Sequence, residues 1–476
     1  MKYIEDKVEN INIAYIGGGS MEWAWKIMSD LALEESLSGT IKLFDINYEA
    51  AYANEIIGNK LLKRNEVKGK WKYKAVKSLK EAILNADIVF ISILPGTFQE
   101  MKSDVHLPEK YGIYQSVGDS VGPGGIVRAL RTIPMFIEFA KAIKEYCPEA
   151  WIINYTNPMS VLVRTLYKVF PEIKAFGCCH EVFGTQKLLA MMLKEMRGIN
   201  GINREEIKVN ILGINHFTWI NRASYKGINL IPLYSEFVDK YYEDGYEQSE
   251  KGHWMNDYFS SAELVKFDLF RRFGLMAAAG DRHLAEFVPG TWYLKDPETV
   301  KRWKFSLTPV DWRIERKKEL KEKSRRLVNG EEEFELKPSG EEDVKQIKAL
   351  LGLGDLITNV NIPNIGQINN LPDKVIVETN AVFRRDRIEP VIAGKLPEEL
   401  LNLVITHVLN QETLLKAVLT KDKELAFRVF LNDPQIMRLD ISDARDLFIK
   451  MLENVKEYLA FNLRIPCGLP HGKLRN

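Results

Sequence analysis

The chain has 476 residues, 46% of them hydrophobic and 28% charged, a composition typical of a folded globular protein with room for two domains. Lysine and arginine (66) nearly balance aspartate and glutamate (65), so no overall charge favours binding to nucleic acid or to an anionic membrane. Four cysteines are too few for a disulfide framework, and no apolar run reaches membrane-spanning length, so we expect a cytoplasmic protein with reduced thiols.

Strands and helices alternate through the first 196 residues. β-prone and apolar runs predict strands at 11–16, 41–44, 88–94, 151–154 and 175–178. Apolar residues at helical spacing predict helices at 23–33, 48–64, 128–146 and 183–196. This alternation predicts a Rossmann-like, doubly wound parallel sheet over residues 1–196.

The remaining residues, 197–476, are less regular. Charged helices are expected at 315–326 and 341–351, where a solvated surface is the simplest interpretation, a strand at 375–379, and amphipathic helices at 397–419, 424–431 and 442–461. We expect an α+β domain that contributes substrate, metal and oligomer contacts.

A glycine-rich loop, Gly17-Gly18-Gly19-Ser20, follows the first strand and opens a helix. Gly17 permits a tight turn, and Gly19 lets the backbone approach a pyrophosphate at the positive helix N-terminus. Asp45 ends the second strand, where a carboxylate accepts from a ribose hydroxyl and disfavours a 2′-phosphate, so NAD is expected rather than NADP. Glu22 departs from the usual third glycine, and a loop alone is also compatible with an ordinary turn. The remaining expected cofactor contacts are Ser20, Pro95 and Asn154.

Two polar segments follow strands of the predicted sheet. In Gly118-Asp119-Ser120-Val121-Gly122, Asp119 is suited to bonding sugar hydroxyls or a metal-bound water, or else caps a turn. In Asn154-Tyr155-Thr156-Asn157-Pro158, either asparagine is suited to orienting a hydroxyl or the nicotinamide ribose, and helix capping explains one of them equally well. Both segments belong at the carboxyl edge of the sheet, where such folds bind ligands.

Three further motifs carry metal-ligating or ionisable groups. Cys179 and His180 lie where a strand meets a helix, and His216 lies between Asn215 and aromatic residues. Cys179 and His216 together form a possible two-ligand metal site. Taken singly, a cysteine here is more often a small buried apolar residue, and a histidine here is more often a hydrogen-bonded core residue. The segment Asp281-Arg282-His283 places an acid, a cation and a possible base together, or forms a surface salt bridge.

Taken together, these motifs resemble glycoside hydrolase family 4 over most of the chain. The resemblance rests on residues 16–20, 118–125, 128–134, 157–158, 179–182, 215–216, 366–372 and 377–378. It implies a lactate/malate dehydrogenase-like architecture and NAD-dependent hydrolysis, in which hydride leaves sugar C3, the C2 proton and then the aglycone depart, water adds, and hydride returns. A divalent metal, usually manganese, holds the C2 and C3 oxygens.

The resemblance also assigns roles by position. Cys179 and His216 match the metal ligands, and Asn157 and Asp119 match orienting residues. His180 stands where phospho-sugar members have an acidic aspartate. Those members use a tyrosine as base; the corresponding region of this chain offers Asp281, Arg282 and His283 instead, and we expect Asp281 as the base, with Arg282 or His283 contacting substrate.

The substrate class is read from the Cys-His-Glu-Val form of the motif, which resembles the α-galacturonidase subgroup through Glu181. Arg131, Arg282 and His283 are expected to meet the C6 carboxylate of a pectin-derived galacturonide. An α-glucuronidase or α-glucosidase of the same family stays open, as do a 2-hydroxy-acid dehydrogenase and an inactive NAD or sugar sensor. The resemblance implies a homodimer or homotetramer.

The cysteine provides a direct test of the metal site. Cys179→Ser is expected to weaken binding of Mn²⁺ and abolish turnover while the fold survives, because a hydroxyl is a poor substitute for a thiolate ligand. Manganese titration, circular dichroism and activity assays check this. Unchanged activity in the variant would remove Cys179 from the site.

Overall fold

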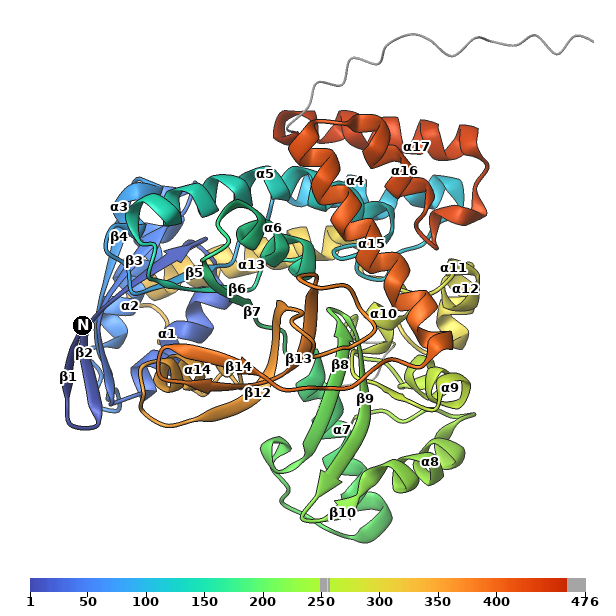
Figure 1. Cartoon of the computed structure of the whole chain (residues 1–476). Helices are drawn as coiled ribbons and strands as arrows, with labels where there is room; N and C mark the ends of the chain where they lie inside the picture. Colours follow the sequence, from blue (N-terminus) through green and yellow to red (C-terminus); the bar gives the residue numbers. More distant parts are fainter. Residues whose placement is uncertain (249–254, 256, 460–476) are drawn as a thin grey trace, which may run out of the picture.

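The computed structural model describes residues 1–248, 255 and 257–459, so Cys467 and the last two residues of the helix expected at 442–461 lie outside the described residues. Its main sheet has ten strands: β1 (Lys2–Ile4), β2 (Lys7–Ile16), β3 (Leu37–Phe44), β4 (Lys70–Val76), β5 (Ile88–Ile91), β6 (Trp151–Asn154), β7 (Lys174–Gly177), β12 (Leu356–Pro363), β13 (Ile376–Arg384) and β14 (Arg387–Pro390). Their order is β14-β13-β12-β7-β6-β5-β2-β3-β4, with β1 paired to β2 (Figure 1).

Strands β2 to β7 are parallel; the central strand β5 is buried on both faces, whereas β4 at the edge alternates between exposed and buried residues. All four residues of β5 are buried, as expected of a central parallel strand. Along β2, Ile13 and Tyr15 enter one core, whereas Ala14 and Ile16 enter the other. The first core is closed by α1 (Trp23–Leu33), α2 (Tyr48–Leu61), α13 (Val310–Asn329) and α14 (Asp343–Leu350). The second is closed by α3 (Leu79–Ile83), α5 (Gly122–Tyr146), α6 (Met159–Val169), α15 (Glu398–Thr420), α16 (Lys423–Leu431) and α17 (Ile441–Asn454). The doubly wound fold is therefore confirmed.

The strand order creates a switch point between β2 and β5. From β2 the chain builds outward through β3 and β4, and from β5 it builds the other way through β6 and β7. The helices that follow β2 and β5 therefore leave toward opposite faces, which opens a crevice at the carboxyl ends of these two strands. The glycine-rich loop directly follows β2 at this crevice.

The chain after residue 197 contributes to two bodies (Figure 1). Strands β12 to β14 extend the main sheet in antiparallel fashion, joined to β7 where Asn361 pairs with Gly177. A second, four-stranded sheet contains β8 (Lys208–Ile214), β9 (Phe217–Tyr225), β10 (Ile228–Asn229) and β11 (Met276–Ala277). It packs against α7 (Glu181–Arg197), α8 (Leu230–Tyr241) and α9 (Leu264–Phe273).

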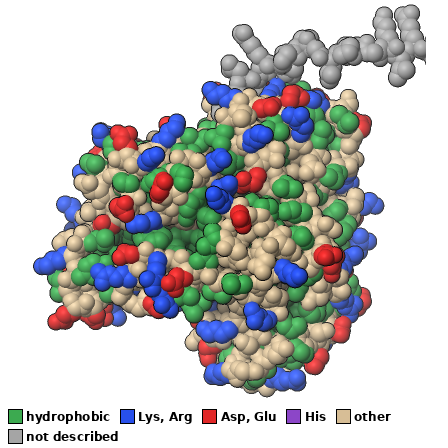
Figure 2. Space-filling model, viewed as in Figure 1, with side chains coloured by type: hydrophobic (Ala, Val, Ile, Leu, Met, Phe, Trp, Pro, Cys, Tyr) green, Lys and Arg blue, Asp and Glu red, His purple; other side chains and the backbone are tan. Residues whose placement is uncertain are grey.

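Short helices complete the described chain: α4 (Phe98–His106), α10 (Asp281–Leu284), α11 (Gly290–Tyr293) and α12 (Pro297–Arg302), with 3-10 turns at Pro108–Tyr111, Arg204–Glu206, Ile436–Arg438 and Lys456–Tyr458. Two peptide bonds are cis, Asn157–Pro158 and Asn215–His216. Within the described ranges, no helix combines the length and apolarity needed to cross a membrane. On the face seen in Figure 2, acidic and basic side chains are interspersed, which agrees with the balanced composition.

Candidate active site

The glycine-rich loop is shaped by close backbone packing at the switch point. Gly17 has φ +92°, and a Cβ there would lie 1.9 Å from the carbonyl oxygen of Ser92 after β5. The Gly19 amide donates to Asp45 Oδ2 at 3.0 Å, so Asp45 fastens the loop to the end of β3. The Ser20 hydroxyl accepts from the amide of Trp23 at 3.1 Å, which starts α1. Only glycine fits at the first position, and the bend presents a helix N-terminus to the crevice.

Two of the expected cofactor contacts are occupied by other partners. Asn154 is fully buried, and its side chain donates to the Thr156 carbonyl and accepts from the Thr156 amide, both at 3.0 Å. It shapes the loop after β6, so the expected contact of its side chain with a cofactor is wrong. The Pro95 carbonyl accepts from Arg131 Nε at 2.9 Å, which ties the loop after β5 to helix α5.

Three ionisable side chains from distant parts of the chain converge beside this crevice. Asp119 precedes α5, His216 lies between β8 and β9, and His283 lies on α10; their candidate ligand atoms lie within 4.8 Å of one another. The two imidazole rings stack with centroids 4.0 Å apart. Asn157 Nδ2 donates to Asp119 Oδ2 at 3.0 Å. Carboxylate and imidazole ligands in this arrangement suit a divalent cation.

Ser120 connects two members of this cluster. Its hydroxyl donates to Asp119 Oδ1 at 2.7 Å and lies 3.0 Å from Nδ1 of His216. Because the hydroxyl proton points at the carboxylate, the serine oxygen accepts from Nδ1–H of the histidine. The Nε2 lone pair of His216 then remains available to a metal, as in the supported ligands of known metal sites.

The electrostatics of the cluster favour a cation. Burial opposes ionisation of Asp119, but the positive charges of His283 and Arg128 outweigh it and hold the pKa of this carboxyl low. Burial and the neighbouring His283 lower the pKa of His216 to about 3, so its imidazole is neutral. An ionised carboxylate beside a neutral imidazole is the protonation pattern that metal binding requires.

Cys179 lies next to this cluster but outside its three-residue core. Its carbonyl accepts from Asn359 Nδ2 at 3.2 Å. Burial, followed by the charges of Glu378 and Glu181, raises the pKa of the Cys179 thiol well above its usual value. A bound cation would reverse this by deprotonating the thiol. The pairing of Cys179 with His216 as ligands stays a prediction.

Glu181 and His180, which follow the cysteine, face different neighbours. Glu181 Oε2 accepts from the Gly280 amide at 2.7 Å, and its Oε1 lies 3.3 Å from Nδ1 of His283. Glu181 therefore reaches the cluster by holding a histidine. The His180 ring stacks on Trp23 with centroids 5.8 Å apart, and its Nδ1 lies 3.4 Å from Glu341. This places His180 beside the glycine-loop helix.

The expectation that Asp281 is the base is contradicted by its placement. Its side chain is fully buried and accepts from the amides of Val265 and Lys266 at 3.2 and 3.0 Å, at the start of α9. Burial and the nearby Glu263 raise the pKa of Asp281 to about 7. A carboxylate that caps a helix inside the core has no access to a substrate proton.

Both arginines expected at the substrate are also engaged elsewhere. Arg131 is fully buried and forms a two-pronged ion pair with Asp104 at 3.0 and 2.6 Å, so its expected substrate contact is wrong. Arg282 donates to the Ser116 carbonyl at 2.7 Å, to the Ser306 carbonyl at 3.2 Å, and to the hydroxyl of Thr308. Most of its donors therefore hold loops together. The sequence shows that Arg131 and Arg282 are charged, but it does not show which groups they pair with in the folded chain.

Sequence reasoning missed Arg313, at the start of α13. Its Nε is completely buried and has no hydrogen-bond partner among the described residues. Burial lowers the pKa of Arg313, opposed by the charges of Asp119 and Glu22. Arg313 therefore lies near Asp119 of the cluster and near Glu22, which precedes α1. The guanidinium carbons of Arg313 and Arg282 lie 5.7 and 5.1 Å from the centroid of the Phe259 ring.

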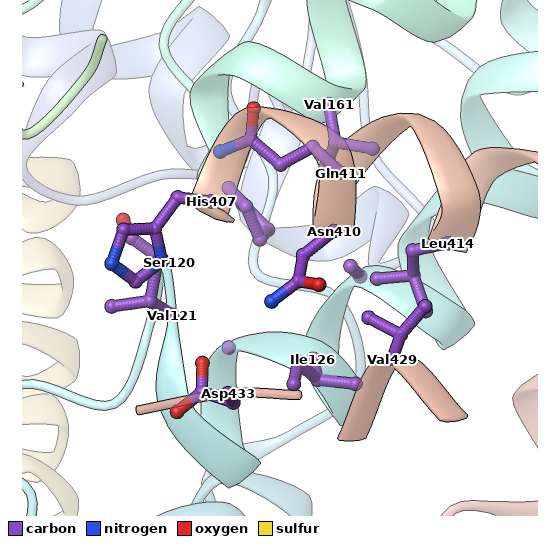
Figure 3. Close-up of a pocket in the computed structure, with 13 residues that line it drawn as sticks. Ser120, Val121, Ile126, Val161, His407, Asn410, Gln411, Leu414, Val429 and Asp433 are labelled. Atoms are coloured by element: carbon purple, nitrogen blue, oxygen red, sulfur yellow. The ribbon is translucent and has the colours of Figure 1, made fainter. Parts of the chain in front are cut away.

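A small cavity behind Ser120 supports the loop that carries Asp119 (Figure 3). Its polar lining groups have structural partners: His407 Nε2 lies 2.7 Å from the Phe287 carbonyl, and Asp433 accepts from the Gly122 amide at 3.0 Å. These bonds fix the start of α5. The cavity is therefore part of the support for the cluster.

Comparison with known proteins identifies the family. The family model described as "Family 4 glycosyl hydrolase" matches residues 12–195, and the model of the C-terminal domain of the same family matches residues 211–436. The chain belongs to glycosyl hydrolase family 4. It is thus a glycoside-hydrolysing enzyme by family, and the resemblance drawn from its motifs is confirmed.

Relatives within family 4 match nearly the whole chain. An alpha-galacturonidase from Thermoanaerobacterium saccharolyticum is 64% identical over 459 residues, covering 96% of this chain and 98% of the relative. An alpha-galacturonidase from Bacillus subtilis is 55% identical, covering 94% and 98%. The solved structure of lplD from Bacillus subtilis has 55% identity and a TM-score of 0.89, covering 94% and 100%. The 6-phospho-beta glucosidase from Thermotoga maritima, solved with manganese, NAD+ and glucose-6-phosphate, has a TM-score of 0.75 at 22% identity, covering 95% and 100%, and shares the fold.

The corrected role of Arg131 provides a test. Arg131→Met is expected to destabilise the protein by roughly 3–5 kcal/mol, because it leaves Asp104 buried without its cation. The double variant Arg131→Met/Asp104→Leu should recover part of this loss. Urea unfolding measures both. A single variant of wild-type stability with a raised KM would instead return Arg131 to the substrate site.

Proposed function

We propose that this family 4 enzyme hydrolyses α-galacturonides, including pectin-derived oligogalacturonides. The observation that carries the proposal is 64% identity, over nearly the full length, to a protein named alpha-galacturonidase. The Cys-His-Glu-Val motif supports it, since Glu181 holds His283 at the cluster. An α-glucuronidase or α-glucosidase remains the alternative within the family.

The residues present fit the NAD and divalent metal that this chemistry needs. The loop at Gly17 leaves no room for a side chain, and Asp45 stands at the ribose position at the end of β3. Cys179 and His216 would hold the metal, with Asp119 beside them. When bound, NAD takes and returns a hydride, and the metal acts as a Lewis acid on sugar oxygens.

The chain itself supplies the proton transfers. With Asp281 occupied and Arg282 permanently protonated, His283 is the proposed base for the C2 proton. Burial lowers the proton affinity of His283, but Glu181 outweighs this and raises its pKa, so His283 serves as the base only in its deprotonated form, whose share grows as the pH rises. Its Nδ1 faces Glu181, which leaves Nε2 toward the cluster. His180, held at 3.4 Å by Glu341, is the proposed acid for the leaving group.

Recognition of the C6 carboxylate falls to Arg313 in this proposal. Its guanidinium lies near Asp119 and Glu22, and its buried Nε has no hydrogen-bond partner among the described residues. A partly buried guanidinium with a free donor favours an anionic substrate group. Arg282, whose guanidinium also lies over the Phe259 ring, adds positive charge.

Cellular location and assembly stay predictions. The described cysteines, Cys147, Cys178 and Cys179, are unpaired, which supports a reducing cytoplasm. A homodimer or homotetramer is proposed from the family resemblance alone.

The substrate class is tested with p-nitrophenyl α-galacturonide, α-glucuronide and α-glucoside, each with NAD+, Mn²⁺ and a thiol reductant. We expect selective cleavage of the galacturonide with no net NADH, because the hydride is returned within each turnover. Selective cleavage of the glucuronide would overturn the substrate assignment. Stoichiometric NADH would favour a dehydrogenase, and NAD binding without turnover of any glycoside would favour a sensor.

The carboxylate contact is tested with Arg313→Met. We expect kcat/KM for the galacturonide to fall roughly 100-fold, about 2.7 kcal/mol, while the much weaker activity on the neutral α-galactoside is unchanged. The control is Arg316→Met, one helical turn along α13, where the side chain is exposed and pairs with Glu319 at 2.9 Å. Equal losses on both substrates would exclude a role for Arg313 in reading the carboxylate.

A further inference from the structure

Glu378, in β13, is a buried carboxylate that the proposed chemistry does not use. Only 1% of the residue is exposed. Asn359 Nδ2 donates to its Oε1 at 2.7 Å, and Asn215 Nδ2 donates to its Oε2 at 3.1 Å. Both donors are neutral amides. Burying a carboxylate among amides is costly, so its retention calls for a reason beyond packing.

The strand register explains how Glu378 comes to lie here. It faces Asn361 across the antiparallel pair β12–β13, and Asn359, two residues earlier, points to the same face. Asn361 in turn pairs with Gly177 at the end of β7, two residues before Cys179. The added strands therefore place this carboxylate beneath the cysteine.

Each amide that Glu378 holds also contacts one side of the proposed metal site. Asn359 Nδ2 donates to the Cys179 carbonyl at 3.2 Å, as well as to the glutamate. Asn215 immediately precedes His216, and its side chain lies close enough to the Cys179 thiol to affect the pKa of that group. Through these two asparagines, the Glu378 carboxylate is connected to the backbone of Cys179 and to the residue that precedes His216.

We infer that Glu378 is a positioning residue that fixes Cys179 and His216 at the separation a divalent metal requires. The inference rests on the proposed function, because it concerns the same metal site. Its role depends on two acceptor oxygens facing two amide donors. Cys179 lies in the loop after β7 and His216 in the β8–β9 turn, and Glu378 accepts from one asparagine beside each of them.

The isosteric variant Glu378→Gln separates hydrogen bonding from packing. It replaces one acceptor oxygen by an NH₂ group, so a donor then faces the donor of Asn359 or Asn215. One asparagine must rotate, which breaks either the bond to the Cys179 carbonyl or the contact beside His216. Loss of such outer-shell partners commonly weakens metal binding roughly 10–100-fold.

The experiment is titration of full-length protein with Mn²⁺, without substrate, following free Mn²⁺ by electron paramagnetic resonance. Wild type, Cys179→Ser, Glu378→Gln and a control, Asp268→Asn, are compared. Asp268, on α9, is also a buried carboxylate. It accepts from the hydroxyl of Tyr293 at 2.5 Å and from Nε of Arg272 at 2.6 Å. We expect Glu378→Gln to bind Mn²⁺ roughly 10–100-fold more weakly, and the control to bind like wild type even if its melting temperature falls.

The outcomes distinguish this inference from the proposed function. Binding by wild type and Glu378→Gln with equal affinity, but not by Cys179→Ser, would overturn the role of Glu378 alone. No binding by wild type would overturn the proposed metal site and this role with it. If Glu378→Gln does not fold, Glu378→Asp retains both oxygens but withdraws them by one methylene. We expect weakened Mn²⁺ binding in this folded variant, and wild-type affinity would again overturn the role.

Discussion

The proposed chemistry depends on one backbone contact, the pairing of Asn361 with Gly177 where β12 joins β7. A Cβ on Gly177 would come within 2.3 Å of Met159 Sδ and 3.1 Å of Asn361 Cβ, so the approach requires glycine. Through this contact, a segment nearly two hundred residues later in the chain completes the sheet beside Cys179. The parallel half supplies the nucleotide crevice, and the antiparallel extension supplies the buried side chains below the cysteine.

Charge is the second organising constraint at this edge. Asp119 is held ionised by the positive charges of His283 and Arg128 despite its burial. Around it lie guanidinium groups with very different partners: Arg131 is neutralised by Asp104, whereas the Nε of Arg313 is buried and unpaired within the described part of the chain. The site therefore has an anionic carboxylate, Asp119, suited to a cation, and a nearby guanidinium, Arg313, suited to the carboxylate of a uronate. Arg313 and Arg131 are the same type of residue, and their hydrogen-bond and ion-pair partners decide which of them is available to substrate.

The sequence predicted the elements whose signal is local. The apolar run at 88–94 and the loop at Gly17 predicted a buried strand and a nucleotide turn; the strand is present but ends at Ile91, and the turn is present. Cys179 follows β7 and so falls at the carboxyl edge of the parallel sheet, whereas His216 lies in the turn between the antiparallel strands β8 and β9 and Asp119 lies just before α5. The strand at Lys70–Val76 was missed, although its alternating burial matches a half-exposed strand and the period-two pattern was there to find.

What sequence could not show is which charges folding neutralises. Asp281 and Arg131 look like active-site groups in one dimension, yet one caps α9 and the other pairs with Asp104 in the core. Arg313 lies just before the charged helix predicted at 315–326, which was interpreted as a solvated surface. In the structure it belongs to the first turn of α13, and its Nε is buried by packing that the sequence does not show. Helix α5 likewise starts at Gly122, earlier than the predicted residue 128, because Pro123 suits the first turn.

We propose that NAD acts as a catalyst inside a hydrolysis, with proton removal at C2 of the sugar. Hydrolysis of an α-galacturonide in D₂O, followed by magnetic resonance or mass analysis of the released galacturonic acid, tests this directly. We expect deuterium at C2 of the product. Product released at a normal rate without deuterium at C2 would exclude proton removal at this carbon.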